Sequence, residues 1–183
     1  MFQLVTGGSG SGKSAYAEEL LTAPARLSDA ASDTSVLPHI YLATMKPYGK
    51  ETLEKIRRHR RLRAGKGFVT VECPKGLDEV VLLENDGVLL ECIANLAANE
   101  LYREDGSLNG RQETADRILS GIRSIRRQTG HLVVVTNEVC ADTGDYSSET
   151  REYMALLGAL NRQLARMADT VTEVVYGIPV SVK

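Results

Sequence analysis

The stretch FQLVTGGSGSGKSAYAEEL, Phe2–Leu20, decides the fold that we expect for this chain. Its first part, Phe2–Thr6, is a short apolar run typical of a strand, and Ala15–Leu21 is typical of a helix. The loop between them matches G-x-x-x-x-G-K-[ST], the P-loop pattern for binding nucleoside triphosphates. The loop residues, all predicted to contact nucleotide, are Gly7, Gly8, Ser9, Gly10, Ser11, Gly12, Lys13 and Ser14.

Each residue type in this loop suits phosphate binding. Glycines let the backbone turn so that successive N–H groups point at phosphate oxygens, next to the positive end of the helix dipole. Lys13 is predicted to reach the β- and γ-phosphates as a catalytic residue, and the Ser14 hydroxyl to hold Mg²⁺. The alternative is a glycine-rich turn that binds nothing. Four glycines, a lysine and a serine in register favour the nucleotide site.

Composition sets further limits. The chain has 183 residues, of which 43% are hydrophobic and 25% charged, and we expect a single nucleotide-binding domain over residues 1–183. A net charge of −2 gives no global attraction to nucleic acid. No apolar run approaches the ~20 residues of a membrane span, and the N-terminus resembles no signal peptide. Three widely spaced cysteines, Cys73, Cys92 and Cys140, predict neither disulfides nor zinc. Together these features predict a cytoplasmic protein.

Strand-like and helix-like segments alternate after the P-loop. The expected strands are His39–Thr44, Phe68–Cys73, Gly87–Cys92, His131–Thr136, Val171–Tyr176 and Pro179–Val182. The expected helices are Glu51–Arg63, Leu77–Leu83, Ile93–Tyr102, Thr114–Gln128 and Glu149–Ala168, and Thr22–Pro38 is expected to be a surface loop. This order predicts an α/β fold of the P-loop NTPase type. Its doubly wound, mostly parallel sheet is flanked by helices and ends in a short antiparallel strand.

Polar residues follow several of these strands. Glu91 ends an apolar strand in the Walker B manner and is predicted to hold Mg²⁺ together with Ser14. Asn137 and Glu138 follow the next buried strand. In open α/β sheets ligands bind at the carboxyl ends of the strands. We therefore expect Lys13, Ser14, Glu91 and these two residues to cluster at one edge.

The segment Glu51–Arg63, ETLEKIRRHRRLR, is helix-like and strongly basic. Leu53, Ile56, His59 and Leu62 recur at spacings of three and predict one stripe that faces the fold. His59 thus occupies a place where an apolar residue is expected. Two interpretations stay open from the residues alone, a packed, hydrogen-bonded histidine and a nucleophile. The arginines are typical of a solvated face or of a nucleic-acid contact.

Several segments together resemble one family, the bifunctional adenosylcobinamide kinase/adenosylcobinamide-phosphate guanylyltransferases of cobalamin biosynthesis. They are LVTGGSGSGKS, IYLAT, KIRRHRR, TVEC, VLLLEC, VVVTNEV, LNRQLA and YGIPVSVK. The resemblance implies phosphorylation of adenosylcobinamide by a nucleoside triphosphate. It also implies transfer of GMP from GTP to the resulting phosphate, through a guanylylated histidine. His59 falls on that catalytic position, and the neighbouring histidine of the family is Arg58 here.

The resemblance also implies further site residues, GTP or ATP as substrates, Mg²⁺, a corrinoid substrate and a homotrimer. The additional nucleotide contacts that it implies are Ala43, Thr44, Met45, Arg60, Arg61, Leu62, Arg63, Glu72 and Glu91. The chain departs from the family pattern at Gly10, where arginine is usual, in the loop Cys140–Tyr146, and at Met154 and Ala155.

Two alternatives belong to other classes. A different P-loop kinase of small metabolites or nucleotides needs Lys13, Ser14 and Glu91 but not His59. A non-catalytic module could use the arginine helix to hold nucleic acid, and its binding would then depend steeply on salt. Net charge −2 and the absence of interleaved aromatic residues along Lys55–Lys66 count against that module.

Overall fold

A computed structural model of the chain describes residues 1–22, 37–85, 87–139 and 144–183, without the side chains of residues 51, 52, 55 and 62. It shows one seven-stranded sheet in the order β3-β2-β4-β5-β1-β6-β7, in which only β6 and β7 pair antiparallel. The strands are β1 Phe2–Thr6, β2 His39–Ala43, β3 Phe68–Glu72, β4 Gly87–Glu91, β5 Leu132–Val135, β6 Thr170–Val175 and β7 Ile178–Ser181. The predicted mostly parallel α/β sheet is confirmed.

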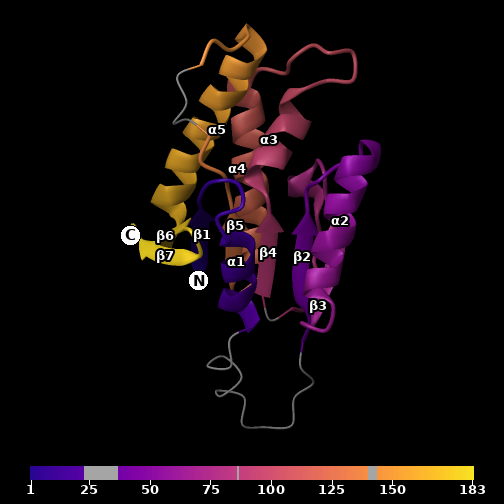
Figure 1. Cartoon of the computed structure of the whole chain (residues 1–183), viewed down its shortest axis with the longest axis vertical. Coiled ribbons are helices and arrows are strands. Elements are labelled where there is room, and N and C mark those ends of the chain that lie inside the picture. The colour runs from indigo at the N-terminus through magenta and orange to yellow at the C-terminus, as the bar shows by residue number, and fades with distance from the viewer. Residues whose placement is uncertain (23–36, 86, 140–143) are drawn as a thin grey trace.

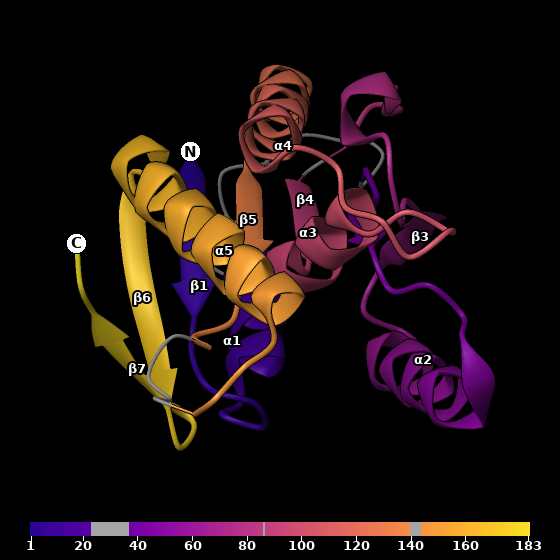
Figure 2. The same cartoon turned by 90° about the horizontal axis from the view of Figure 1, so that it is seen from above.

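Helices cover both faces of this sheet (Figures 1 and 2). Helices α1 and α2 lie on one side, and α4 lies on the other with α3 and α5 packed beside it. Their bounds are α1 Lys13–Thr22, α2 Gly49–Arg63, α3 Ile93–Leu101, α4 Arg111–Arg127 and α5 Ser148–Met167. None of the helices in the described ranges has the length and apolar character of a membrane span.

The central strands are apolar because they are covered on both faces. All four residues of β5 are buried, as are the first four of β4, so neither strand alternates between apolar and polar residues. Helix α4 places Ile118, Ile122 and Ile125 on its buried side, as the helical spacing predicts. The expected surface loop Thr22–Pro38 lies almost wholly outside the described residues.

One expected helix is wrong. Only Leu77–Glu79 of the segment Leu77–Leu83 is helical, as the single 3₁₀ turn η2. The side chain of Gln128 in the α4 C-cap accepts from the backbone N–H of Leu82 and donates to the carbonyl of Val80. These bonds satisfy backbone groups that would otherwise need a helix, and Val81 and Leu83 then stay exposed.

The ends of β2 and β4 are joined by Thr44, whose side chain is fully buried. Its hydroxyl donates to the carbonyl of Cys92 at 2.9 Å and accepts from the Cys92 N–H at 2.7 Å. The Thr44 carbonyl in turn accepts from Asn99 Nδ2 at 2.8 Å. Thr44, which follows β2, thus fixes Cys92, which follows Glu91. These bonds set the position of Glu91 at the carboxyl edge of the sheet.

Replacing Thr44 by valine is expected to destabilise the protein by about 1–3 kcal/mol, because the buried Cys92 N–H and C=O lose their partner at nearly constant side-chain volume. Urea unfolding followed by circular dichroism measures the change. The control is Thr70→Val, at an exposed position of β3, which should cost less than about 0.5 kcal/mol. Equal losses in the two variants would show that the Thr44 hydroxyl bonds contribute little.

Candidate functional site

The P-loop connects β1 to α1 at the carboxyl edge of the sheet (Figure 1). Gly8, Ser9 and Gly10 are exposed, so the loop faces solvent. Gly7 has φ +150°, and a Cβ there would lie 2.5 Å from the carbonyl oxygen of Val174. Only glycine therefore lets the loop pass this close to β6. The strand–loop–helix context expected for a P-loop is present.

Lys13, the first residue of α1, is only 8% exposed. Its Nζ donates to the carbonyl of Gly8 at 2.9 Å, so the ammonium lies inside the turn of the loop. Burial lowers the pKa of Lys13, and the nearby Cys92 and Glu91 oppose that shift. Among the described residues the ammonium donates to one backbone carbonyl, so it is well placed to gain from an anion beside it.

The structure brings together two predicted metal ligands that are far apart in the sequence. The Ser14 hydroxyl donates directly to Oε1 of Glu91, the last residue of β4. Oε2 of the same carboxylate accepts from the Tyr41 hydroxyl at 3.0 Å. Burial, and then the Glu91 charge, raise the pKa of Tyr41, which keeps this hydroxyl protonated as a donor. Glu91 is therefore held at both oxygens beside the P-loop.

Tyr41 also contacts the end of the arginine helix. The guanidinium of Arg63 lies 3.4 Å from the centre of the Tyr41 ring, and Arg63 is only 6% exposed. Such cation–π contacts contribute about 0.5–2 kcal/mol. Within the described part of the chain, Nε and Nη1 of Arg63 are buried without a hydrogen-bond partner. A continuous series of contacts thus runs from Arg63 through Tyr41 and Glu91 to Ser14.

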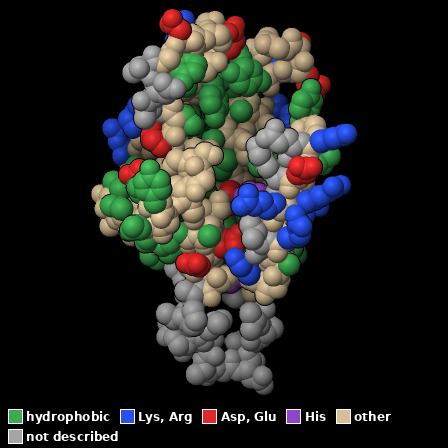
Figure 3. All heavy atoms as spheres, in the orientation of Figure 1, with side chains coloured by type: hydrophobic (Ala, Val, Ile, Leu, Met, Phe, Trp, Pro, Cys, Tyr) green, Lys and Arg blue, Asp and Glu red, His purple; other side chains and the backbone are tan. Residues whose placement is uncertain are grey.

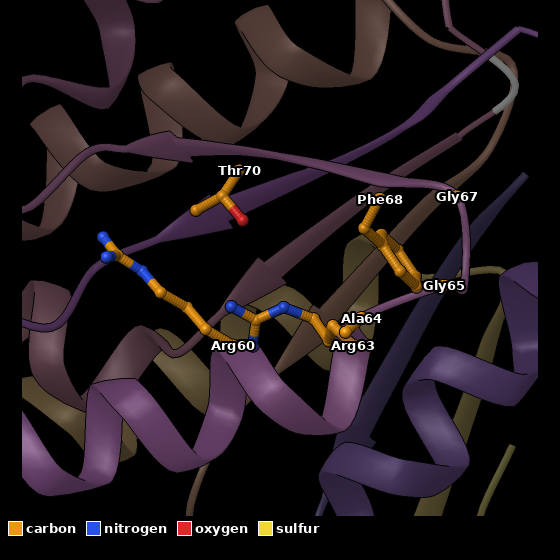
Figure 4. Close-up of a pocket in the computed structure, with 7 residues that line it drawn as sticks. All are labelled: Arg60, Arg63, Ala64, Gly65, Gly67, Phe68 and Thr70. Atoms are coloured by element: carbon orange, nitrogen blue, oxygen red, sulfur yellow. The ribbon is translucent and has the colours of Figure 1, made fainter.

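A cavity of about 160 Å³ lies between the C-terminal end of α2 and β3. Arg60 and Arg63 border it from α2, Phe68 and Thr70 border it from β3, and the connecting glycines close it (Figure 4). Ligand pockets usually measure about 300–1,000 Å³, so this cavity is too small for a whole nucleotide. Arg60 Nη2 forms an ion pair with Oε1 of Glu72 at 2.7 Å. Arg60 and Glu72, both predicted to bind nucleotide, therefore contact each other beside this cavity.

The predicted stripe on α2 is only partly correct. Ile56 and His59 are half-buried, but Leu53 is 41% exposed, and the Leu62 side chain lies outside the described residues. Among the described side chains of α2, arginines in the last turn make the cation–π and ionic contacts to the rest of the protein, and Figure 2 shows the helix standing apart from α1. His59 lies one residue before Arg60.

One further contact ties α2 to the P-loop helix. Lys66, in the turn after α2, donates to Oε2 of Glu18 on α1 at 2.5 Å, and the Glu18 side chain is almost fully buried. The histidine-bearing helix is therefore connected to the P-loop by two routes, through Lys66 to α1 and through Tyr41 to Glu91. Arg57, Arg58 and Arg61 stay exposed and give this side of the molecule its basic surface (Figure 3).

The other predicted edge residues fall into two groups. Ala43 pairs in register with Glu72 on β3 and with Glu91 on β4, so these three side chains share one face of the sheet. Met45, two residues after Ala43, is half-buried. The hydroxyl of Thr44 between them is hydrogen-bonded to the backbone of Cys92.

The segment after β5 lies against the loop, because the Glu138 N–H donates to the carbonyl of Gly7 at 3.3 Å. Asn161 on α5 donates to the carbonyl of Asn137 at 3.2 Å. Glu138 thus borders the P-loop through a backbone contact, and Asn161 holds the residue that precedes it.

Tyr41 is the residue that sequence reasoning missed. It lies two residues before Ala43 on β2, and alternate residues of a strand face the same side. A tyrosine on the face that carries Glu91 was therefore readable from the pattern. Its contact with Arg63 was not, because it depends on where α2 is placed in space.

The donor set at the loop is of the kind that Mg²⁺ prefers. Ser14 Oγ and Glu91 Oε1 are hard oxygen donors in direct contact, and Mg²⁺ is commonly held by one or two carboxylates plus substrate phosphates and water. Among the described residues no three histidine, cysteine, aspartate or glutamate side chains gather as a protein-only metal centre. The residues therefore fit a metal ion that arrives with a nucleotide.

Comparison with known proteins agrees with this geometry. A family model described as "Cobinamide kinase / cobinamide phosphate guanyltransferase" matches residues 3–182. The chain is 33% identical to the bifunctional adenosylcobalamin biosynthesis protein CobU of Escherichia coli (strain K12) and 32% identical to that of Salmonella typhimurium, over the whole of each protein. It is 27% identical to the protein CobP of Pseudomonas aeruginosa, over 98% of that protein. The chain therefore belongs to the family of bifunctional cobinamide kinase and cobinamide-phosphate guanylyltransferase enzymes of adenosylcobalamin biosynthesis.

Proposed function

We propose that this enzyme uses its single P-loop for both reactions of its family and His59 as the nucleophile of the second. The observation that supports the proposal is the direct contact of Ser14 with Glu91, which joins the carboxylate at the end of β4 to the serine of the P-loop. In P-loop enzymes this pair holds Mg²⁺ against the β- and γ-phosphates. Bound there, Mg²⁺ would offset the charge that develops on the phosphate oxygens.

In the kinase reaction the hydroxyl of adenosylcobinamide attacks the γ-phosphorus of ATP or GTP. An O–P bond forms, the bond to the bridging oxygen of the β-phosphate breaks, and the hydroxyl loses its proton. Lys13 is already buried in the loop and exchanges the Gly8 carbonyl for phosphate oxygens. It thereby stabilises the charge that moves onto the leaving diphosphate.

In the second reaction an imidazole nitrogen of His59 attacks the α-phosphorus of GTP and releases pyrophosphate. An oxygen of adenosylcobinamide phosphate then attacks the same phosphorus, which restores His59 and yields adenosylcobinamide-GDP. Arg60 and Arg63 follow His59 on the same helix, and Arg63 has two N–H groups without partners among the described residues. These donors suit the charge of the guanylyl group and the departing pyrophosphate.

The nucleotide contacts implied at Ala43, Thr44, Met45, Arg61, Leu62 and Glu72 belong to the same proposal. The register of Ala43 with Glu72 and Glu91 supports these contacts. The three side chains lie side by side on one face of the sheet, from the P-loop side toward α2. A homotrimer and a cytoplasmic location are likewise proposed from the family alone.

Replacing His59 by alanine is expected to abolish covalent labelling by GTP that carries label on the α-phosphate, because no nucleophile remains. Protein is incubated with the labelled GTP and Mg²⁺, denatured and scored for acid-labile label. Phosphorylation of adenosylcobinamide by ATP should stay within about threefold of wild type. The matched control is His39→Asn, which replaces a histidine on β2 and should keep the label. Undiminished label in His59→Ala would exclude His59 as the nucleophile.

Replacing Glu91 by glutamine is expected to lower the rates of both reactions at least about 100-fold, because Mg²⁺ loses its carboxylate ligand. Tyr41→Phe removes only the donor to Glu91 Oε2 and should raise the half-saturating Mg²⁺ concentration several-fold with a smaller loss of rate. Mg²⁺ titration of each rate, with calorimetry of ATP binding, measures both effects. Glu79→Gln, at an exposed position of η2, is the control. An unchanged Mg²⁺ requirement in Glu91→Gln would contradict the metal assignment.

A further inference from the structure

The turn between β6 and β7 packs directly against the P-loop. The Gly177 N–H donates to the carbonyl of Ser11 at 2.8 Å. A Cβ placed on Gly12 would lie 3.2 Å from the Cα of Gly177, so the two backbones are in close contact. Tyr176, which precedes Gly177, is 94% exposed. A large aromatic side chain therefore projects into solvent beside the phosphate loop.

The backbone conformation of the β6–β7 turn does not favour a tyrosine at position 176. Val175 pairs with Ile178, so Tyr176 and Gly177 form a two-residue hairpin loop, with φ of +50° and +80°. Positive φ at both central residues defines the type I′ turn, which strongly favours asparagine followed by glycine. A bulky residue in the left-handed region is strained, and such strain concentrates at functional sites. Tyr176 buries almost none of its surface in return.

The position of this turn is set by the sheet order. Strand β1 leads into the P-loop, with β5 and then β4 on one side and β6 on the other. Glu91 of β4 contacts Ser14, so the metal and the γ-phosphate belong on the β4 side of the loop. The rest of a nucleotide held by its β- and γ-phosphates can then extend the other way, toward the β6–β7 turn. Figure 2 shows that turn and α2 on opposite sides of the loop.

We propose that Tyr176 stacks on the nucleobase of the triphosphate that donates its γ-phosphate in the kinase reaction. The inference rests on the proposed function of the P-loop. Stacking on an aromatic ring suits any purine, because every base has a π-face, so the site takes both ATP and GTP. It serves the phosphoryl donor, since a nucleoside at this turn has its γ-phosphate, and not its α-phosphate, toward the side of His59.

The test compares nucleotides with a ligand that lacks the base. Tyr176→Asn is expected to weaken ATP binding about tenfold in calorimetry with Mg²⁺, because the stacking surface is lost. Binding of inorganic tripolyphosphate should change less than about twofold. The thermal midpoint should not fall, since asparagine suits the type I′ turn. Tyr176→Phe keeps the ring and should bind ATP within about twofold of wild type.

A control variant and two further measurements separate base stacking from other roles of Tyr176. Ile178→Thr changes a neighbouring exposed apolar residue of the same hairpin and should leave ATP binding unchanged. The KM for ATP in the kinase reaction should rise about tenfold in Tyr176→Asn, whereas the GTP concentration for half-maximal labelling of His59 should stay within about twofold. A lower molar mass by light scattering in Tyr176→Asn would overturn the proposal in favour of a subunit contact.

The inference and the proposed function fail in different ways. Unchanged ATP binding in Tyr176→Asn, or equal losses for ATP and tripolyphosphate, would overturn stacking by Tyr176 and leave the P-loop assignment intact. Equal losses in the kinase reaction and in His59 labelling would overturn the restriction to the phosphoryl donor. Wild-type protein that binds neither ATP nor tripolyphosphate would instead contradict the P-loop assignment itself, and with it the inference.

Discussion

The contact between Ser14 and Glu91 is the constraint on which the rest of the site depends. It joins the start of α1, which follows β1, to the end of β4, and the sheet order places β5 between β1 and β4. Because Tyr41 holds the other carboxylate oxygen and Thr44 fixes Cys92, Glu91 has little freedom to turn away from the loop. Contacts within the protein therefore hold this carboxylate beside the loop, which lowers the cost of assembling the site during the reaction.

Helix α2 is held by a different kind of interaction. Its named contacts are the Arg63–Tyr41 stack and the Arg60–Glu72 ion pair, with Lys66–Glu18 just beyond its end. The exposed Arg60–Glu72 ion pair contributes about 0–1 kcal/mol, and a cation–π contact about 0.5–2 kcal/mol. A buried leucine contributes more than an exposed ion pair of this kind. Among the described side chains, these charged contacts hold the C-terminal end of the helix that carries His59, and a polyphosphate can compete for them.

The sequence predicts the sheet and the P-loop well, because strand–loop–helix patterns and buried apolar runs depend on nearby residues. Glu91 was readable for the same reason, as an acid that ends a buried strand. The failures involve partners distant in sequence. The segment Leu77–Leu83 is apolar enough for a helix, but the amide of Gln128 binds its backbone first. The spacing on α2 favours Leu53, whereas Arg63 is the residue buried, because an aromatic ring lies opposite it. No local pattern reports such a partner.

The two reactions place conflicting demands on one loop. In the proposed scheme, the kinase reaction needs the γ-phosphorus beside its acceptor, whereas guanylyl transfer needs the α-phosphorus beside His59. The surroundings of the loop are asymmetric in a way that meets both demands. The exposed ring of Tyr176 lies on the β6 side, and Arg63, with buried donor nitrogens that have no partner among the described residues, lies on the β2–β3 side. A nucleoside directed toward Tyr176 leaves its γ-phosphate beside Glu91 for the kinase reaction. One directed toward Ala43 and Arg63 brings the α-phosphorus to the α2 side. On the proposed function, one P-loop that binds nucleotide in two orientations serves both activities, and no second phosphate-binding loop is needed.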